Sequence, residues 1–407
     1  MRNLIVFIIF LLVFQQGEAQ NLKVGISSAI INPPIGSYIA GDKQDRTFTG
    51  IHDNLYAKAV VISSGKESVA IMTLDCIGLL HSDVQKIRQK TAEICQFPVE
   101  RIVISSTHTH SGPDVVGIWG KDYSVSGVNV DYMDFLISTA AIQIKNAFEN
   151  QQVTRAFTTQ TTFGESWVKN ICDEEIDRTV SIIQFRDIQQ RPIATLTNFA
   201  CHPTFMDAVN SEISADYIYG YYNELTKSIG GEVLFLQGAI GGWVQPENEA
   251  KTFENAYRRG SELANEVSLA LMNAKPISSN LIQHKSKKIR IPVQNEGWRQ
   301  LSDAGIIKRK ISETVDTEIT FFSIGDAQFI THPGETAPFY AIESRKMMSK
   351  GTKFILGLGN DALGYILKPI YFEDSTLPHS EYLTRMSVGQ QAGPIILQGI
   401  KELIKQK

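Results

Sequence analysis

Strand-like and helix-like segments alternate along most of this chain of 407 residues, and this alternation restricts its fold more than any other feature. Short runs rich in β-branched residues predict strands, and longer segments with apolar residues three or four positions apart predict helices. This order is typical of an α/β fold with β-sheets covered by helices. The segment 153–199 is rich in strands and has no predicted helix, so we expect mixed sheets. The predicted strands are 55–63, 68–75, 101–106, 180–185, 193–199, 233–236, 318–324, 328–331 and 353–358, and the predicted helices are 82–95, 132–148, 215–229, 253–272, 337–347 and 390–404.

The chain has no Pro-, Ser- or Gly-rich linker, no internal repeat and no low-complexity segment, so we expect one large domain over residues 20–407. The first 19 residues have a different composition from the rest of the chain. Met1-Arg2-Asn3 precede the eleven apolar residues 4–14, and the small residues Gly17 and Ala19 follow, which is the pattern of a cleavable signal peptide over 1–19. An apolar block of this length is too short to span a bilayer. We therefore expect an exported protein, secreted or periplasmic, with no transmembrane segment in its mature chain.

The overall charge gives no reason to expect a nucleic acid as partner. The 39 basic and 43 acidic residues leave a formal charge of −4, without a run of five like charges. With 43% hydrophobic residues the chain has ordinary globular composition. We expect a small-molecule, lipid or glycan partner, and the sequence does not define an oligomeric state.

Two histidines follow one of the predicted strands directly. The segment 104–113 reads Ile-Ser-Ser-Thr-His-Thr-His-Ser-Gly-Pro and contains His108 and His110. On an extended backbone, residues two apart project to the same face, so both rings can enter one cavity. Neutral imidazoles are common zinc ligands. Taken alone, the pair is equally compatible with one histidine hydrogen-bonded in the core and the other solvated.

Three further elements lie at or after predicted strands. His202 and Pro203 end one strand, the tripeptide Pro333-Gly334-Glu335 follows another, and Tyr365 follows Gly364 in a loop. Each is weak by itself, because an isolated Glu is usually solvated and an isolated Tyr usually packs. Binding sites of α/β folds collect where strands end. Together with the histidine pair, these elements predict one polar site.

These residues resemble the neutral/alkaline ceramidase family, the non-lysosomal zinc amidases. The resemblance includes segments 32–34, 50–59, 74–75 and 106–113, and then His202, 333–335 and 364–365 in the family's order. It implies a neutral-ceramidase-like catalytic domain that binds Zn²⁺. By position, the implied metal ligands are His108, His202, Glu335 and Tyr365. His110 is then expected to act on the substrate or leaving group.

The sequence departs from that family at two places. The family's ceramidases carry a nucleophilic serine in a Gly-x-x-Ser-Pro segment, whereas residues 235–246 contain no serine and Gln245 precedes Pro246. They also continue into an immunoglobulin-like domain, and we expect no such domain here because the chain ends soon after Tyr365. The resemblance therefore predicts the fold and the metal site better than the substrate.

We expect an exported zinc-dependent hydrolase of an amide or ester bond, in an N-acyl lipid, an acylated sugar or a related compound. Water activated by the zinc ion is the expected nucleophile, and His110 and Tyr365 are the expected catalytic side chains. The residues expected to contact the substrate or to support the ligands are Asp75, Gly241, Gly242 and His379.

The alternative is a zinc-binding pseudoenzyme that lost turnover with the serine and acts as a glycan- or lipid-binding protein. All four implied ligand positions are intact, which favours the hydrolase.

Overall fold

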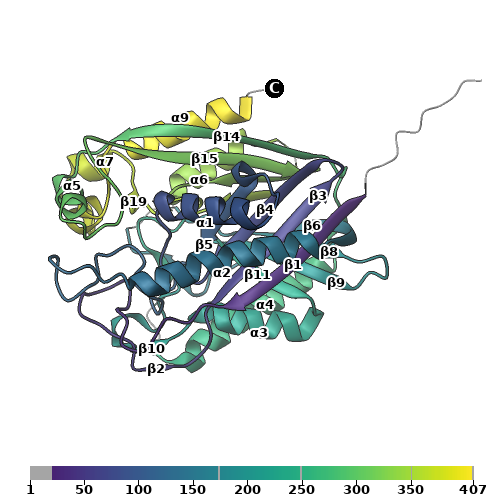
Figure 1. Ribbon diagram of the computed structural model, residues 1–407, viewed down its shortest axis with the longest axis horizontal. Coiled ribbons are helices and arrows are strands. Elements are labelled where there is room, and N and C mark those ends of the chain that lie inside the picture. Colours follow the sequence, from purple (N-terminus) through teal and green to yellow (C-terminus); the bar gives the residue numbers. More distant parts are fainter. Residues whose placement is uncertain (1–20, 173–174, 248–249, 350, 406–407) are drawn as a thin grey trace, which may run out of the picture.

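The computed structural model describes residues 21–172, 175–247, 250–349 and 351–405 (Figure 1). The predicted signal peptide over 1–19 lies outside these residues. No helix in the described part of the chain combines the length and the apolar character that crossing a bilayer requires.

The larger sheet is mixed, and it consists of two halves that are joined by a short strand pairing. Its order is β11, β9, β8, β6, β1, β3, β4, β5, in which the pairs β11–β9 and β4–β5 are parallel and the other pairs antiparallel. Because β1 pairs with β6 only at residues 22–24, the sheet divides there into two halves. The bounds are β1 Leu22–Ile30, β3 Tyr56–Ser64, β4 Glu67–Leu74, β5 Ile102–Ser106, β6 Gln152–Thr162, β8 Thr179–Arg186, β9 Pro192–Phe199 and β11 Glu232–Gln237, with β13 Lys275–Pro276 beside β6.

A second sheet packs against both halves of the first. Its order is β14, β15, β16, β18, and β16 and β18 are parallel. The two halves of the larger sheet and the second sheet form three groups of strands. One apolar cluster joins these groups, and it includes Val60, Phe185, Leu236, Phe322 and Phe329. Removing these side chains from water favours this arrangement of the strands. The bounds are β14 Ile282–Pro292, β15 Thr314–Ile324, β16 Ala327–Thr331 and β18 Lys353–Leu356.

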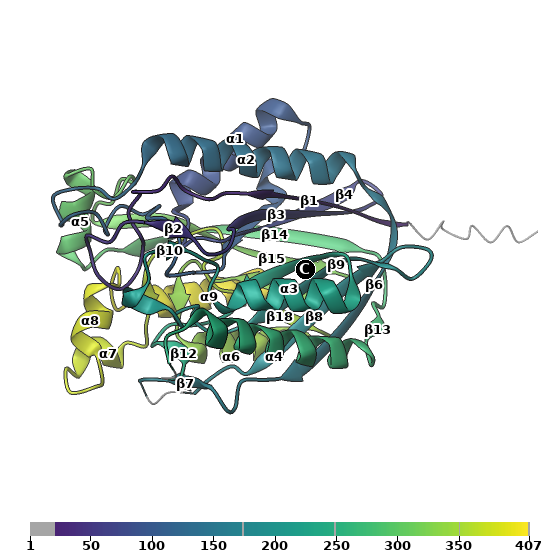
Figure 2. The same ribbon diagram turned by 90° about the horizontal axis from the view of Figure 1, so that it is seen from below.

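Helices cover the outer faces of the strands (Figures 1 and 2). The helices α1 and α2 lie over the half with β1 and β3, α3 and α4 over the half with β6 and β11, and α6 and α9 over the second sheet. As a result β3 and β4 are buried along almost their whole length, which explains their continuous apolar sequences. The bounds are α1 His81–Ile94, α2 Val130–Glu149, α3 Tyr217–Ile229, α4 Phe253–Leu271, α5 Glu296–Asp303, α6 Pro338–Met347, α7 Ile370–Glu373, α8 Ser380–Arg385 and α9 Ala392–Lys405, with 3₁₀ turns η1 Val99–Arg101 and η2 Asp207–Val209.

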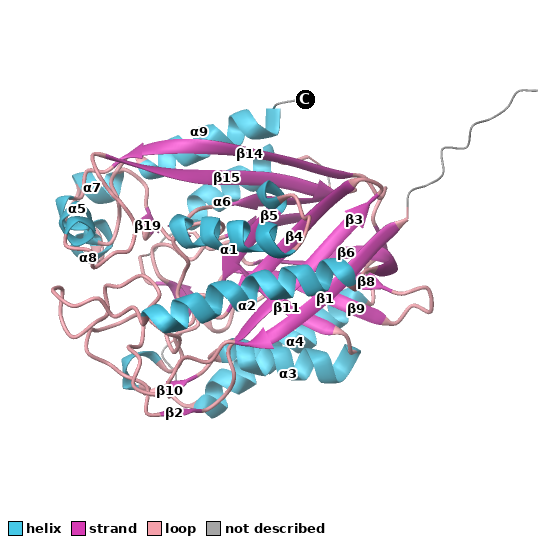
Figure 3. Ribbon diagram, in the orientation of Figure 1, coloured by secondary structure: helices cyan, strands magenta, loops and turns pink. Residues whose placement is uncertain are grey.

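Long loops and three short strand pairs gather at one end of the molecule (Figure 3). The loops after β5, β9 and β16 meet there. This arrangement confirms the predicted fold class, mixed sheets covered by helices. The short pairs are β2 Gly50–Ile51 with β10 Glu212–Ile213, β7 Val168–Asn170 with β12 Val244–Pro246, and β17 Glu335–Thr336 with β19 Tyr365–Ile366.

Candidate metal and active site

The expected metal ligands come together where the three groups of strands end. His108 follows β5, His202 follows β9, and Glu335 follows β16 and begins β17. The Nε2 atom of His202 lies 3.2 Å and the Nε2 atom of His108 lies 3.4 Å from Oε2 of Glu335. All three residues are largely buried.

Backbone carbonyls set the orientation of both imidazoles. Nδ1 of His202 donates to the carbonyl oxygen of Val244 at 2.9 Å, and Nδ1 of His108 donates to that of Ile77. Each ring therefore keeps the Nε2 lone pair for the centre of the cluster, as metal-binding histidines do. Ligand atoms of a tetrahedral zinc ion lie roughly 3.3 Å apart, given Zn–N distances of about 2.0–2.1 Å. The donor set and its spacing fit zinc.

Tyr365 reaches the cluster beside Glu335. The two residues are direct partners in the parallel pair β17–β19. The phenol oxygen of Tyr365 accepts a hydrogen bond of 2.5 Å from Nε1 of Trp243. Burial and the negative charge of Glu335 raise the pKa of Tyr365 well above its usual value, so the phenol is protonated at neutral pH. Burial alone would raise the pKa of Glu335 too, but His108 and His202 hold it well below its usual range.

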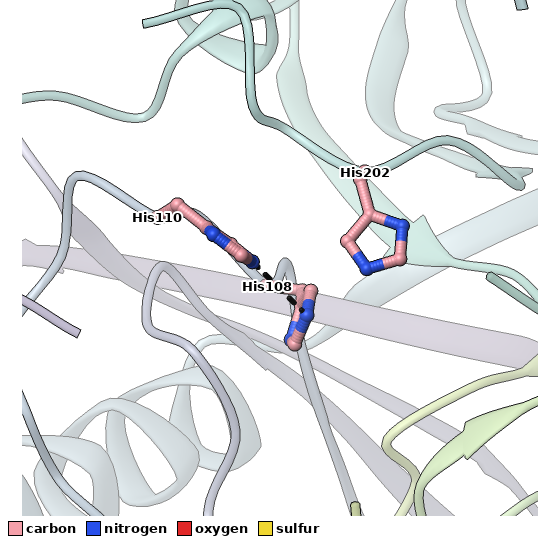
Figure 4. A group of neighbouring side chains, drawn as sticks. All are labelled: His108, His110 and His202. Carbon is pink, nitrogen blue, oxygen red and sulfur yellow. Dashed lines mark hydrogen bonds between the residues drawn. The ribbon is translucent and has the colours of Figure 1, made fainter. Parts of the chain in front are cut away.

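The ring of His110 completes a group of three imidazoles (Figure 4). Nε2 of His110 lies 3.4 Å from Nε2 of His108, and one nitrogen from each of His108, His110 and His202 lies within 4.8 Å of the others. His110 and Tyr365 both adjoin the cluster, and either could complete the donor set of His108, His202 and Glu335. The extended backbone expected for this pair is wrong, because β5 ends at Ser106 and His108 has φ of 70°. A left-handed turn brings the two rings together.

Asp42 and Arg46, which were not predicted as site residues, lie behind His110. Nδ1 of His110 lies 3.3 Å from Oδ1 of Asp42, and Arg46 donates to the other oxygen of this carboxylate at 3.3 Å. Arg46 also donates to the carbonyl oxygens of Ala40 and Gly41 at 3.1 and 2.9 Å. Gly41 has φ of 83°, and a Cβ atom there would lie only 2.4 Å from Nδ1 of His110. A Gly-Asp pair in a loop carries no sequence signal that could have revealed this contact.

Asp75 directly follows β4 and holds the segment next to His108 in place. Its carboxylate accepts hydrogen bonds from the backbone N–H of Tyr56 at 2.9 Å and from the hydroxyl of Tyr222 at 3.2 Å. Burial raises the pKa of Asp75 to about 6. The carbonyl of Ile77, two residues further on, holds the ring of His108. Asp75 therefore anchors the segment that orients this ligand.

Gly241, Gly242 and His379 lie around Glu335 and Tyr365. The N–H of Gly241 donates to the carbonyl of Thr336 at 2.9 Å, and a Cβ atom on Gly241 would lie 2.3 Å from the carbonyl oxygen of Glu335. Gly241 thus allows close packing against β17 and has no N–H left for a substrate. Gly242, with φ of 78°, leads into Trp243. The ring of His379 lies 4.6 Å from that of Trp243, the residue that bonds Tyr365.

The cluster opens into a cavity of about 410 Å³. His110, His202 and Tyr365 line this cavity together with Trp243 and Gln245. Gln245 stands where the resemblance places a serine, and its side chain offers an amide rather than a nucleophilic hydroxyl.

The chain is similar to known proteins in sequence and in fold. Residues 36–226 match the family described as neutral/alkaline non-lysosomal ceramidase, N-terminal. Neutral ceramidase A of Dictyostelium discoideum is 26% identical over 193 residues, which cover 41% of this chain and 26% of that protein. Neutral ceramidase of Drosophila melanogaster is 24% identical over 221 residues, which cover 49% of this chain and 31% of that protein. The matched part thus spans less than a third of either relative.

The fold extends the likeness beyond the matched segment, which contains His108, His110 and His202 but ends before Glu335. The crystal structure of neutral ceramidase from Pseudomonas aeruginosa superposes with a TM-score of 0.76 at 16% identity, covering 95% of this chain and 75% of that chain. Residues 36–226 of the chain are thus similar to the N-terminal part of the neutral/alkaline non-lysosomal ceramidase family, and the whole fold is similar to that of a neutral ceramidase.

Proposed function

We propose that this protein is an exported zinc-dependent hydrolase of an amide or ester bond. One observation carries the proposal. The Nε2 atoms of His108 and His202 both lie within 3.4 Å of Oε2 of Glu335, and His202 lines the cavity next to this cluster. A zinc ion bound there would polarise a carbonyl oxygen and lower the pKa of water.

His110 is the proton carrier in this proposal. Its Nδ1–H is directed to Asp42, so its Nε2 is left to take a proton from the attacking water and to return it to the leaving group. The carboxylate of Asp42 favours the imidazolium that forms and keeps the ring in one tautomer. Arg46 keeps Asp42 in place.

Tyr365 is a metal ligand in the implied set, and its phenol also faces the cavity. The oxygen of Tyr365 accepts a hydrogen bond from Trp243, and its hydroxyl also interacts with the carboxylate of Glu335. With that carboxylate bound to zinc, the phenol proton would instead point toward the substrate's carbonyl oxygen. The raised pKa keeps that proton on Tyr365 at neutral pH. Tyr365 is therefore the donor for negative charge that develops on this oxygen.

Water is the nucleophile in this proposal, because Gln245 occupies the place of the family's serine. The substrate is an N-acyl lipid, an acylated sugar or a related compound. The segment 1–19 directs export to the periplasm or the exterior.

The metal content of purified variants tests the assignment. We expect about one zinc per chain, loss of most zinc in His108→Ala and His202→Ala, and full zinc with lost activity in His110→Ala. His284→Ala is the matched control, since His284 lies on β14 away from the cluster, and it should keep zinc and activity. Full zinc in both ligand variants would refute the site. Loss of zinc in His110→Ala would make this residue a ligand.

The missing serine also favours the second candidate, a zinc-binding pseudoenzyme that holds a glycan or lipid. A panel of amides and esters, tested with and without a chelator, separates the two. Chelator-sensitive hydrolysis supports the hydrolase, and zinc-dependent binding without turnover supports the pseudoenzyme.

A further inference from the structure

The cluster of candidate metal ligands, His108, His202 and Glu335, lies between two cavities of different character. The first, which we call the charged cavity, is the space of about 410 Å³ described above, and its charged lining residues are Asp42, Lys43, Asp207, Glu247 and Lys251. A narrow space of about 50 Å³, the neck, lies on the other side of the cluster. His110 and Tyr365 line both spaces, so the cluster separates them.

The neck leads on to a largely apolar groove of about 450 Å³, whose lining also includes the charged residue Arg385. Four side chains line both the neck and the groove, and they make the passage between the two continuous. They are Val116, Ile118, Trp298 and Met386. Leu301 and Ile307, in and after α5, line the part of the groove further from the cluster.

Hydrogen bonds hold one wall of the groove in shape. The buried carboxylate of Asp114 accepts three backbone N–H bonds, from Val116 at 2.9 Å, Gly117 at 2.6 Å and Trp119 at 2.9 Å. The hydroxyl of Ser126 donates to the carbonyl oxygen of Ile306 at 3.0 Å and ties this loop to the segment after α5. The groove is thus built before any ligand arrives, which lowers the cost of binding.

The charges of the other cavity are unequally compensated. Lys251 pairs with Asp207, Glu247 pairs with Lys169, and Asp42 pairs with Arg46 behind His110. Lys43 lines the same cavity, and the described residues provide no ion pair for it. An alkyl chain placed there would take these charged groups out of water without replacing their partners, which is unfavourable. A polar group with negative charge would instead meet Lys43.

We infer that the substrate is a single-chain amphiphile with a small anionic head. Its acyl chain passes through the neck into the groove, the amide or ester bond lies at the cluster, and the head occupies the charged cavity near Lys43. N-acyl amino acids are the simplest members of this class. A ceramide fits less well, because its second long chain would lie in the charged cavity. The inference rests on the proposed function for the position of the bond that breaks.

Calorimetry tests the two subsites without turnover, on the full chain with its zinc chelated. The probes are N-dodecanoylglycine and N-dodecanoylethanolamine, which share the chain and differ in head charge. We expect the glycine compound to bind roughly fivefold more tightly, and Lys43→Met to abolish this difference. Shortening the chain should weaken binding about two- to fourfold per methylene, because each buried methylene contributes up to about 0.8 kcal/mol.

A variant pair locates the chain. Leu301→Glu places a charge in the groove and should weaken both probes at least tenfold, whereas Leu269→Glu, on the outer side of α4 with its side chain 56% exposed, should not. Circular dichroism checks that both variants fold. If Leu301→Glu does not fold, the chain-length series in the unmodified protein still tests whether the acyl chain is buried.

Equal affinity for both heads, or no dependence on chain length, would overturn the inference. Kinetics on the zinc-loaded protein separate it from the proposed function. If the protein binds the probes with the expected preference for head and chain but hydrolyses no substrate, the proposed hydrolase is refuted and the two subsites are still supported. Hydrolysis that is fastest with ceramide would keep the hydrolase and refute the single-chain substrate.

Discussion

Replacing Gly41 by Ala adds one methyl group directly behind the proposed proton carrier. The new Cβ atom would lie 2.4 Å from Nδ1 and 2.6 Å from Cγ of His110. Non-bonded carbon atoms prefer separations of roughly 3.5–4.0 Å, so the ring must move by about 1 Å. That movement breaks the 3.3 Å contact between His110 and Asp42. A misplacement of about 1 Å in a catalytic group costs on the order of 10²-fold in rate.

Gly36 provides the matched control. It has φ of 89°, close to the 83° of Gly41, but a Cβ atom there would meet nothing within 4 Å. Both substitutions force alanine into a left-handed backbone, which costs roughly 1–2 kcal/mol of stability. Urea unfolding should therefore show similar losses for the two variants. Only Gly41→Ala should lose activity.

The assay is kcat/KM on the best amide or ester substrate, together with zinc content. We expect Gly41→Ala to keep its zinc and to fall about 100-fold in kcat/KM, while Gly36→Ala stays near the unmodified protein. If Gly41→Ala remains within about threefold of Gly36→Ala, the position of His110 does not limit catalysis and the proton-carrier role is wrong.

Three further predictions concern residues around the cluster. Asp42→Ala should lower kcat by roughly 10²- to 10⁴-fold with little change in KM. Asp42→Asn keeps a hydrogen-bond acceptor and should recover part of this loss. Equal rates for the two variants, or an equal loss in the exposed loop variant Asp45→Ala, would contradict a specific role of Asp42. Because burial raises the pKa of Asp75 from 3.8 to about 6, the stability from its protonated form is present below pH 4 and lost as the pH rises through 6. Relative to Asp75→Asn, the free energy of unfolding should thus fall by up to about 2–3 kcal/mol between pH 4 and 7, and a constant difference would show that Asp75 does not titrate in this range. The proposed mechanism has no serine nucleophile, so a fluorophosphonate should leave no adduct detectable by mass spectrometry. Ceramide turnover should stay below the roughly 1–10³ per second typical of enzymes. Rapid turnover with a labelled residue would show a covalent mechanism.

Local patterns determined most of the secondary structure of this protein. The segments predicted as strands over 55–63 and 68–75 and as helices over 215–229 and 253–272 are present with ends shifted by a few residues. Strands β1 and β14 were not predicted. In β14 the lysines Lys285, Lys287 and Lys288 interrupt the apolar pattern, and the strand forms because it pairs along its whole length with β15. Pairing with a distant partner has no signature in a short sequence window.

The same division applies to the candidate site. The short motifs containing His108, His202, Glu335 and Tyr365 could be recognised from the sequence, because each depends on a strand end and a few neighbouring residues. Their mutual distances depend on how three groups of strands pack around one core.

The contact between His110 and Asp42 joins residues 68 positions apart, and the neck and groove combine side chains from many separate loops and helices. The sequence by itself determined which chemical groups are present and at which strand ends. Only the tertiary structure decided what lies behind His110 and which side chains line the cavities, since both follow from contacts between segments that the chain brings together only on folding.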